Sequence, residues 1–369
     1  MLKKLICALL TVAMLLALIS CGDYEPVPST ADEARTVMTF RIEGEKYELK
    51  YELYRCLFLT YKSLVDGGDE SVWSGDNKAE YIAEIDEMII SAAADIFAVF
   101  HVAKSIGQDP FSNAYEEQIK ELIKTSVDGG ADEDGTIEGF GGDYEAYLDS
   151  LTDYYMNYSV STMILRYSLA YQAIIDHYKG NTYEENLDEG IKIGELQFNE
   201  SNVLEFYNGE ESVRVLMATL DSRSFSSERA QQIRDKMASF TNEEGVKNYI
   251  LSFTATTAED AARGMIVGEY SLDGAYYSAL TEAAFDLGLY QTSSVIPIAT
   301  GSFSSYYILY KTDKSEEFYN ENRADVYSAF IDNEIGKLIG AAKDRLIESG
   351  EASPLLSELV RDQISMEEA

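Results

Sequence analysis

Hydrophobic periodicity changes twice along this chain, and that change constrains the fold more than any other feature. Apolar residues recur at steps of three and four through much of residues 51–177, most regularly from Tyr81 to Lys104. Residues 213–220 and 304–310 are instead short apolar runs of the kind that form buried strands. Helical spacing returns from Ala324 to Ile347. The sequence therefore predicts an α+β protein in which a strand-containing module separates two helical segments.

The same patterns predict the smaller elements. Residues 37–42 alternate as a strand should, Glu43-Gly44-Glu45 forms a turn, and residues 47–49 continue as a second strand. Residues 181–208 form a polar connector. The remaining predicted helices are residues 114–125, 144–177 as one continuous helix, 227–240 capped by Ser226 or Ser227, 258–262 and 279–287.

The first residues have the layout of a secretory signal. Lys3 and Lys4 precede an apolar run from Leu5 to Ile19, which is too short for an ordinary membrane span, and Cys21 follows at once. This ending resembles the lipobox of bacterial lipoproteins, which implies that Cys21 becomes the mature N-terminus and carries lipid. The alternative is a plain signal peptide cut near Ser20. We expect an extracytoplasmic protein that is attached to a membrane through lipid on Cys21.

Charge limits the partners of the chain. The 65 acidic residues against 29 basic ones give a formal net charge of −36. Such a chain is repelled by nucleic acid and by anionic lipid, so neither is an expected partner. Any link to a membrane must come from the lipid, since the chain has too few basic residues for a binding patch.

No cofactor or metal motif is present in the sequence. Cys56, the one cysteine besides Cys7 and Cys21, lies on an apolar helical face and is expected to be a buried small hydrophobe. His101 and His177 are expected to be structural. The acidic loop 128–138 contains Asp-Glu-Asp-Gly, but it lacks both end ligands of a calcium-binding loop, so calcium binding there stays open.

Residues 208–314 contain an ordered series of weak motifs. They are Val213-Arg214-Val215-Leu216-Met217, a helix, Leu251-Ser252-Phe253 to Asp260, Gly268-Glu269-Tyr270, Leu280-Thr281-Glu282-Ala283-Ala284-Phe285, and two last strands at 295–298 and 306–309. Through the order of these motifs, and not through any single one, the segment resembles a parvulin-type peptidyl-prolyl isomerase domain.

The flanking segments resemble PrsA-like and SurA-like foldases. Ile42-Glu43-Gly44-Glu45-Lys46-Tyr47 before a helix and Phe140-Gly141-Gly142-Asp143-Tyr144 before another carry this resemblance. It implies a helical, SurA-N-like chaperone domain that is built from both ends of the chain, with the parvulin-like module inserted, and with the lipobox it favours a Gram-positive source. The predicted boundaries are 1–20 signal peptide, 21–35 tether, 36–207 helical domain, 208–314 parvulin-like domain and 315–369 C-terminal segment completing the helical domain.

The module departs from its family at the catalytic centre. The family uses two histidines with a cysteine or aspartate between them, and this module contains no histidine. The resemblance places Met217 and Tyr307 at the histidine positions and Thr256 or Thr257 at the central one. It also places Tyr270, Tyr276 and Leu280 near the substrate-contacting positions, where ordinary packing is the alternative for each.

Three functions remain open at this point. The first is a tethered chaperone or foldase that binds unfolded exported polypeptides through a module without isomerase activity. The second is an active isomerase with a replaced centre. The third is a solute-binding lipoprotein, which would need two similar α/β lobes and is disfavoured by the long helical first half.

Overall fold

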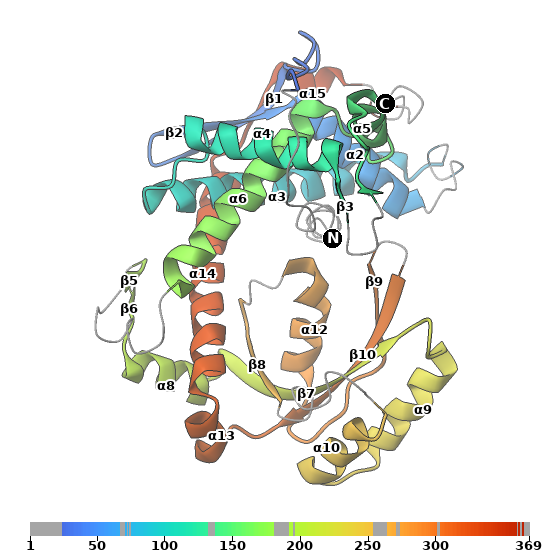
Figure 1. The fold of residues 1–369 in the computed structure, drawn as a ribbon, viewed down its shortest axis with the longest axis vertical. Helices are drawn as coiled ribbons and strands as arrows, with labels where there is room; N and C mark the ends of the chain where they lie inside the picture. Colours follow the sequence, from blue (N-terminus) through green and yellow to red (C-terminus); the bar gives the residue numbers. More distant parts are fainter. Residues whose placement is uncertain are drawn as a thin grey trace. The chain divides into compact units, whose positions relative to one another are not determined.

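The computed structural model of the chain describes residues 24–66, 71, 73, 75–131, 137–180, 192–194, 196–253, 264–270, 274–300, 303–359, 361 and 364. They divide into two compact units (Figure 1). Asp176–Leu338 forms one, which we call the sheet unit, and the described residues up to Ile175 form the other, the helical unit, together with those from Ile339 onward. The mixture of helices with small antiparallel sheets confirms the predicted α+β class. The predicted domain boundaries stay predictions.

The helical unit begins with the predicted hairpin. Strand β1 (Thr36–Ile42) pairs antiparallel with β2 (Glu45–Lys50). Glu43 and Gly44 have φ angles of 50° and 87°, and two successive positive values suit a tight hairpin turn. A strand that the sequence did not predict, β11 (Glu351–Ala352), pairs with the other side of β1 and gives the order β11-β1-β2.

Helices make up most of the rest of this unit. They are α2 (Tyr51–Asp66), α3 (Lys78–Ser105), α4 (Asn113–Asp128), α5 (Tyr144–Thr152), α6 (Tyr158–Lys179) and α15 (Pro354–Glu358), with the short strands β3 (Gly130–Ala131) and β4 (Ile137–Glu138). Residues 92–94 and 96–100 of α3 are all buried, so this helix is buried on several faces there. Cys56 on α2 is buried as predicted, and burial raises the pKa of its thiol to about 12.

The prediction of one continuous helix over 144–177 is wrong. Two helices, α5 and α6, are separated by residues 153–157, and Tyr155 there has a φ of 59°. The side chain of Asn157 accepts a hydrogen bond from the N–H of Val160 at 2.9 Å, which caps the second helix. Because the apolar residues keep helical spacing on both sides of the break, the sequence pattern did not show that one helix ends at Thr152 and another begins at Tyr158.

The sheet unit contains a four-stranded antiparallel sheet. Its strands are β7 (Ser212–Asp221), β8 (Met265–Gly268), β9 (Ile296–Thr300) and β10 (Phe303–Thr312), in the order β8-β7-β10-β9. The two longest strands, β7 and β10, pair from Ser305↔Asp221 to Thr312↔Arg214. Both strands were predicted from the apolar runs at residues 213–220 and 304–310.

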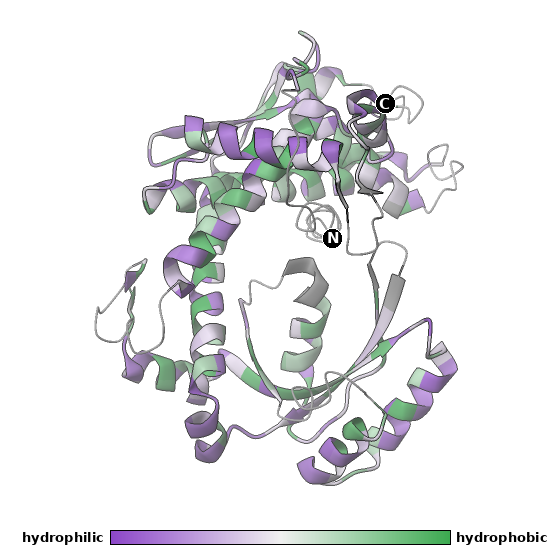
Figure 2. Ribbon diagram, viewed as in Figure 1, coloured by the Kyte–Doolittle hydropathy of each residue, from purple (hydrophilic) through white to green (hydrophobic). Residues whose placement is uncertain are grey.

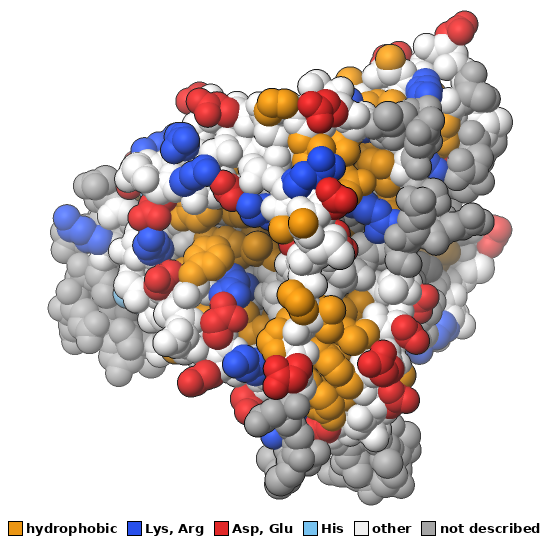
Figure 3. Space-filling model, turned by 90° about the horizontal axis from the view of Figure 1, so that it is seen from above, with side chains coloured by type: hydrophobic (Ala, Val, Ile, Leu, Met, Phe, Trp, Pro, Cys, Tyr) orange, Lys and Arg blue, Asp and Glu red, His pale blue; other side chains and the backbone are white. Residues whose placement is uncertain are grey.

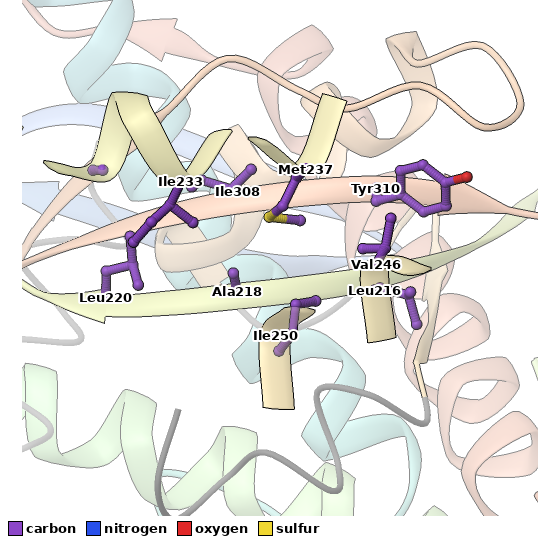
Figure 4. Packing of buried hydrophobic residues seen from close by; sticks show 10 residues of the cluster. Leu216, Ala218, Leu220, Ile233, Met237, Val246, Ile250, Ile308 and Tyr310 are labelled. Carbon is purple, nitrogen blue, oxygen red and sulfur yellow. The ribbon is translucent and has the colours of Figure 1, made fainter. Parts of the chain in front are cut away.

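Helices cover both faces of this sheet. Helix α9 (Ser227–Ala238) and α10 (Glu243–Leu251) pack on one face through Ile233, Met237, Val246 and Ile250, against Leu216, Ala218, Leu220, Ile308 and Tyr310 of β7 and β10 (Figure 4). Both helices also carry hydrophilic residues (Figure 2). Helix α12 (Gly274–Asp286) packs on the opposite face. Ser226 is the cap of α9, and α10, capped by Asn242, was not predicted.

The connector 181–208 is more structured than predicted. It contains β5 (Lys192–Ile193), β6 (Leu196–Gln197) and α8 (Glu200–Asn208), whose first turn is capped by Asn199. Helix α8 packs on α13 (Glu316–Glu321) and α14 (Arg323–Glu348) through aromatic rings, among them Phe206 on Phe330 and Tyr207 on Phe318. The helix predicted at 258–262 lies outside the described residues.

Within the described part of the chain, no helix combines the length and the apolar character that crossing a bilayer requires.

Candidate functional site

On the face of the sheet that α12 covers, the side chains of β7 become more exposed towards the C-terminal end of the strand. Side chains alternate between the two faces of a strand, so residues 213, 215, 217 and 219 share this face. Val213 and Val215 are buried, Met217 is half-buried and Thr219 is exposed. The apolar core on this face therefore ends at an accessible edge beside Met217.

Tyr307 lies at the same edge. In the β7–β10 register Leu309 is opposite Met217, and Tyr307 is opposite Thr219, so Met217 and Tyr307 are diagonal neighbours on one face. Tyr307 and Leu280 of α12 are buried in one apolar cluster, and Met217 packs against it. We call this set the α12-face cluster; its other buried members are Val213, Val215, Ala284, Ile298 and Leu309. The structure thus brings together three residues that the sequence proposed for the site.

The sequence has no histidine between residues 208 and 314, where the α12-face cluster lies. Lys311 lies further along the same face of β10, where its ammonium donates a hydrogen bond to the carbonyl of Phe285 at the end of α12. Burial lowers the pKa of Lys311, partly opposed by the charge of Asp286. The thioether of Met217 is a weak acceptor and the hydroxyl of Tyr307 is one polar group. Among the described residues, this edge offers apolar side chains with one thioether and one hydroxyl, which suit contact with an apolar side chain.

Tyr270 lies apart from the α12-face cluster in its contacts. It follows β8, its side chain is exposed, and its backbone N–H donates to the side-chain oxygen of Asn333 on α14 at 2.9 Å. The ammonium of Lys337 lies 6.0 Å from the centre of its ring. Its exposed ring remains a candidate contact for a bound peptide.

Asn333 was not found from the sequence. It is fully buried on α14 and fixes the turn after β8. A β-carbon added at Gly336 would lie 1.8 Å from the carbonyl oxygen of Tyr270, so the contact requires glycine there. A glycine within a helical pattern was the one available signal of this close approach.

Several other predicted positions lie outside the described residues. They are Cys21, Thr256, Thr257, the side chain of Tyr276 on α12, and residues 132–136 of the acidic loop at 128–138. Among the residues that are described, no group of three or more acidic, histidine or cysteine side chains could hold a metal ion. His101 lies 3.6 Å from a carboxylate oxygen of Glu43, and burial lowers its pKa despite that charge.

Comparisons with known proteins found similarities in structure only. No family model and no curated protein matches the chain. Foldase protein PrsA from Streptococcus pneumoniae is 17% identical with a TM-score of 0.26, covering 69% of this chain and 87% of that one. The PrsA foldase protein from Lactococcus lactis is 14% identical with a TM-score of 0.24, covering 90% and 99%. PrsA from Bacillus subtilis is 14% identical with a TM-score of 0.22, covering 73% and 87%. Because these values are low, the matches carry no conclusion about function.

Proposed function

We propose that this protein is a lipid-anchored extracytoplasmic chaperone that binds unfolded exported polypeptides. Within its sheet unit, residues 208–314 are a parvulin-like module that has lost the catalytic centre and retains an apolar edge. Cys21 carries the lipid, and no cofactor or metal takes part.

The observation that carries this proposal is the α12-face cluster. In its described residues the module runs in the order β7, α9, α10, β8, α12, β9 and β10, and Met217 and Tyr307 share one face. The family would place histidines at these two positions. An apolar edge with one hydroxyl supports binding of apolar or prolyl side chains more than it supports catalysis.

The surface supports the same function. Large apolar side chains are exposed on both units, namely Val27, Phe111, Tyr154, Leu251, Tyr270, Leu289, Tyr290 and Ile347. Figure 3 shows apolar side chains gathered in patches between acidic and basic ones. Such patches can bind exposed segments of an unfolded chain. The net charge of −36 would keep both the protein and a bound client in solution.

The test is suppression of aggregation of an unfolded exported protein. The wild type is expected to suppress light scattering at a ratio near one chaperone per client. The double variant Leu251→Ser, Leu289→Ser removes two exposed apolar side chains and is expected to suppress it less. Glu282→Ser, which shortens an exposed charged side chain on α12, is the matched control. Absence of suppression by the wild type, with a thermal shift on adding a small solute, would instead indicate a solute-binding lipoprotein.

An active isomerase with a replaced centre is the second candidate. The observation in its favour is the hydroxyl of Tyr307 at the edge of the α12-face cluster. Turnover that depends on this hydroxyl would distinguish it from the chaperone without catalysis.

A further inference from the structure

The segment that follows the lipobox cysteine is attached to the helical unit. The ring of Tyr24 stacks on that of Tyr144 with centroids 4.9 Å apart, and its hydroxyl donates a hydrogen bond to the carboxylate of Asp128. The hydroxyl of Tyr144 donates to the carbonyl of Glu25 at 2.9 Å. Tyr24 is thus held by the end of α4 and the start of α5.

A second attachment follows a few residues later. Ser29 donates a hydrogen bond to Glu52 on α2. The amide of Asn157 donates to Glu33 at 3.1 Å and to Glu52 at 3.0 Å. The N–H of Tyr51 donates to the carbonyl of Arg35 at 2.8 Å. From Tyr24 to Arg35 the chain therefore follows the surface of the helical unit and supplies no free spacer.

Covalent geometry then limits the reach of the anchor. Only Gly22 and Asp23 stand between Cys21 and Tyr24. Three steps between α-carbons span at most about 11 Å. Had residues 21–35 been a free tether, the same limit would have been about 50 Å. A lipid on Cys21 would consequently hold Tyr24 close to the headgroups.

We infer that the surface formed by residues 24–28 and 141–144 lies against the lipid bilayer. This rests on the lipid anchor of the proposed function and adds the orientation of the helical unit. Tyr24 and Tyr144 are side chains that suit the membrane interface, and Val27 is 43% exposed beside them. Glu25 and Asp143 are exposed here and favour zwitterionic over anionic headgroups, within a screening length of about 8 Å. The short anchor, not charge, holds the surface in place.

The test compares how close two positions of the lipidated full chain lie to the headgroups of phosphatidylcholine vesicles. The vesicles contain a lipid with a spin label on its headgroup, which quenches nearby fluorophores. A fluorophore is attached at Val27→Cys or at Ala114→Cys. Ala114 is exposed near the start of α4, about 21 Å along the helix from Asp128. Cys56 is buried and its pKa is raised, so it should not be labelled. We expect quenching several-fold stronger at residue 27 than at residue 114, and equal quenching would overturn the inference.

Two variants separate the docked segment from the lipid itself. Fifteen Gly/Ser residues inserted between Asp23 and Tyr24 should reduce quenching at residue 27 to the level at residue 114, while the protein still floats with the vesicles. Tyr24→Ala should reduce it partly, because Ser29 still attaches the segment. Unchanged quenching after the insertion would overturn the inference. A wild type that fails to float would contradict the lipid anchor, and this inference with it.

Discussion

Arg214 is a buried charged side chain of the sheet unit. Its side chain is 4% exposed, its guanidinium donates to both carboxylate oxygens of Glu243 on α10, and it lies 4.0 Å from the centre of the Phe318 ring. Burial would raise the pKa of Glu243, but hydrogen bonds from Lys247, Thr312 and Arg214 outweigh it and the pKa is lowered. The ion pair therefore links β7 to α10, and the contact with the Phe318 ring links β7 to α13.

Glu243→Gln should therefore lower the free energy of unfolding by about 3 kcal/mol, because it leaves a buried guanidinium without its counter-charge. Urea denaturation measures the loss. Asp221→Asn is the matched control, since Asp221 pairs with Arg223 at the surface and its loss should cost far less. Equal losses in the two variants would show that Arg214 is not held as described.

The lowered pKa of Lys314 predicts that the stability of the protein depends on pH. Its ammonium donates to the carbonyls of Gly209 and Ser212 and to the Ser212 hydroxyl, which are all uncharged. Burial and the nearby Lys311 lower its pKa from 10.5 to about 8. Between these values the unfolded chain binds more protons than the folded one, so this lysine makes stability rise with pH.

Replacing Lys314 by Met should flatten that rise. Free energies of unfolding would be measured at pH 7.5 and 9.5 in the wild type and in Lys314→Met. The difference between the two proteins removes the contribution of the tyrosines, which are present in both. Lys337→Met is the control, because the pKa of Lys337 is raised. A pH dependence that is the same in Lys314→Met and the wild type would contradict this assignment.

At the scale of elements, the C-terminal residues complete the small sheet of the helical unit. Besides the β1–β11 pairing, the N–H of Ser353 donates to the carbonyl of Val37 at 2.9 Å, and Arg361 pairs with Asp86 at 3.2 Å. Leu355 on α15 is 8% exposed. These contacts join the two ends of the chain within one unit.

Leu355→Ala should destabilise the helical unit by about 2 kcal/mol or more through lost burial and the cavity that remains. Trp73 is the only tryptophan, is buried in this unit, and reports its unfolding by fluorescence. Glu358→Ala, on the exposed side of α15, should leave the transition unchanged. A Trp73 transition that does not respond to Leu355→Ala would show that the C-terminal helix adds no stability.

Strong periodicity predicted the elements that bury much apolar surface. The hairpin at 36–50, α3, β7, β10 and α14 were all predicted, because each has enough residues for its pattern to show. The short α8 and α10 were missed, and β11 has two residues that are defined only by pairing with β1. At the candidate site, the resemblance proposed Met217 and Tyr307, and the pairing of β7 with β10 puts them on one face. Asn333 could not be found, since its partner Tyr270 is 63 residues away in the sequence.

At the scale of the whole molecule, the chain consists of two compact units that share two helices. The boundary between the units falls within α6, after Ile175, and within α14, after Leu338. Within the sheet unit, Asn333 and Gly336 of α14 pack on the turn that carries Tyr270. Any unfolded polypeptide that contacts Tyr270 would therefore contact a turn that is supported by α14.

The central proposal is that the sheet unit binds unfolded polypeptides without catalysing prolyl isomerisation. The uncatalysed barrier is about 18–20 kcal/mol, and lowering it needs groups that favour the twisted amide over both planar forms. In the α12-face cluster, Met217 offers a thioether, which is a weak acceptor, and Tyr307 offers one hydroxyl. Residues 208–314 contain no histidine, the side chain that most readily changes charge near neutral pH.

The most direct measurement is a protease-free isomerisation assay on a proline peptide with the full chain, run beside the aggregation assay. We predict a rate no faster than the uncatalysed one, together with suppression of aggregation, and no change in either with Tyr307→Phe. Strong turnover that disappears in Tyr307→Phe would contradict the account and would show that the catalytic centre was replaced and not lost.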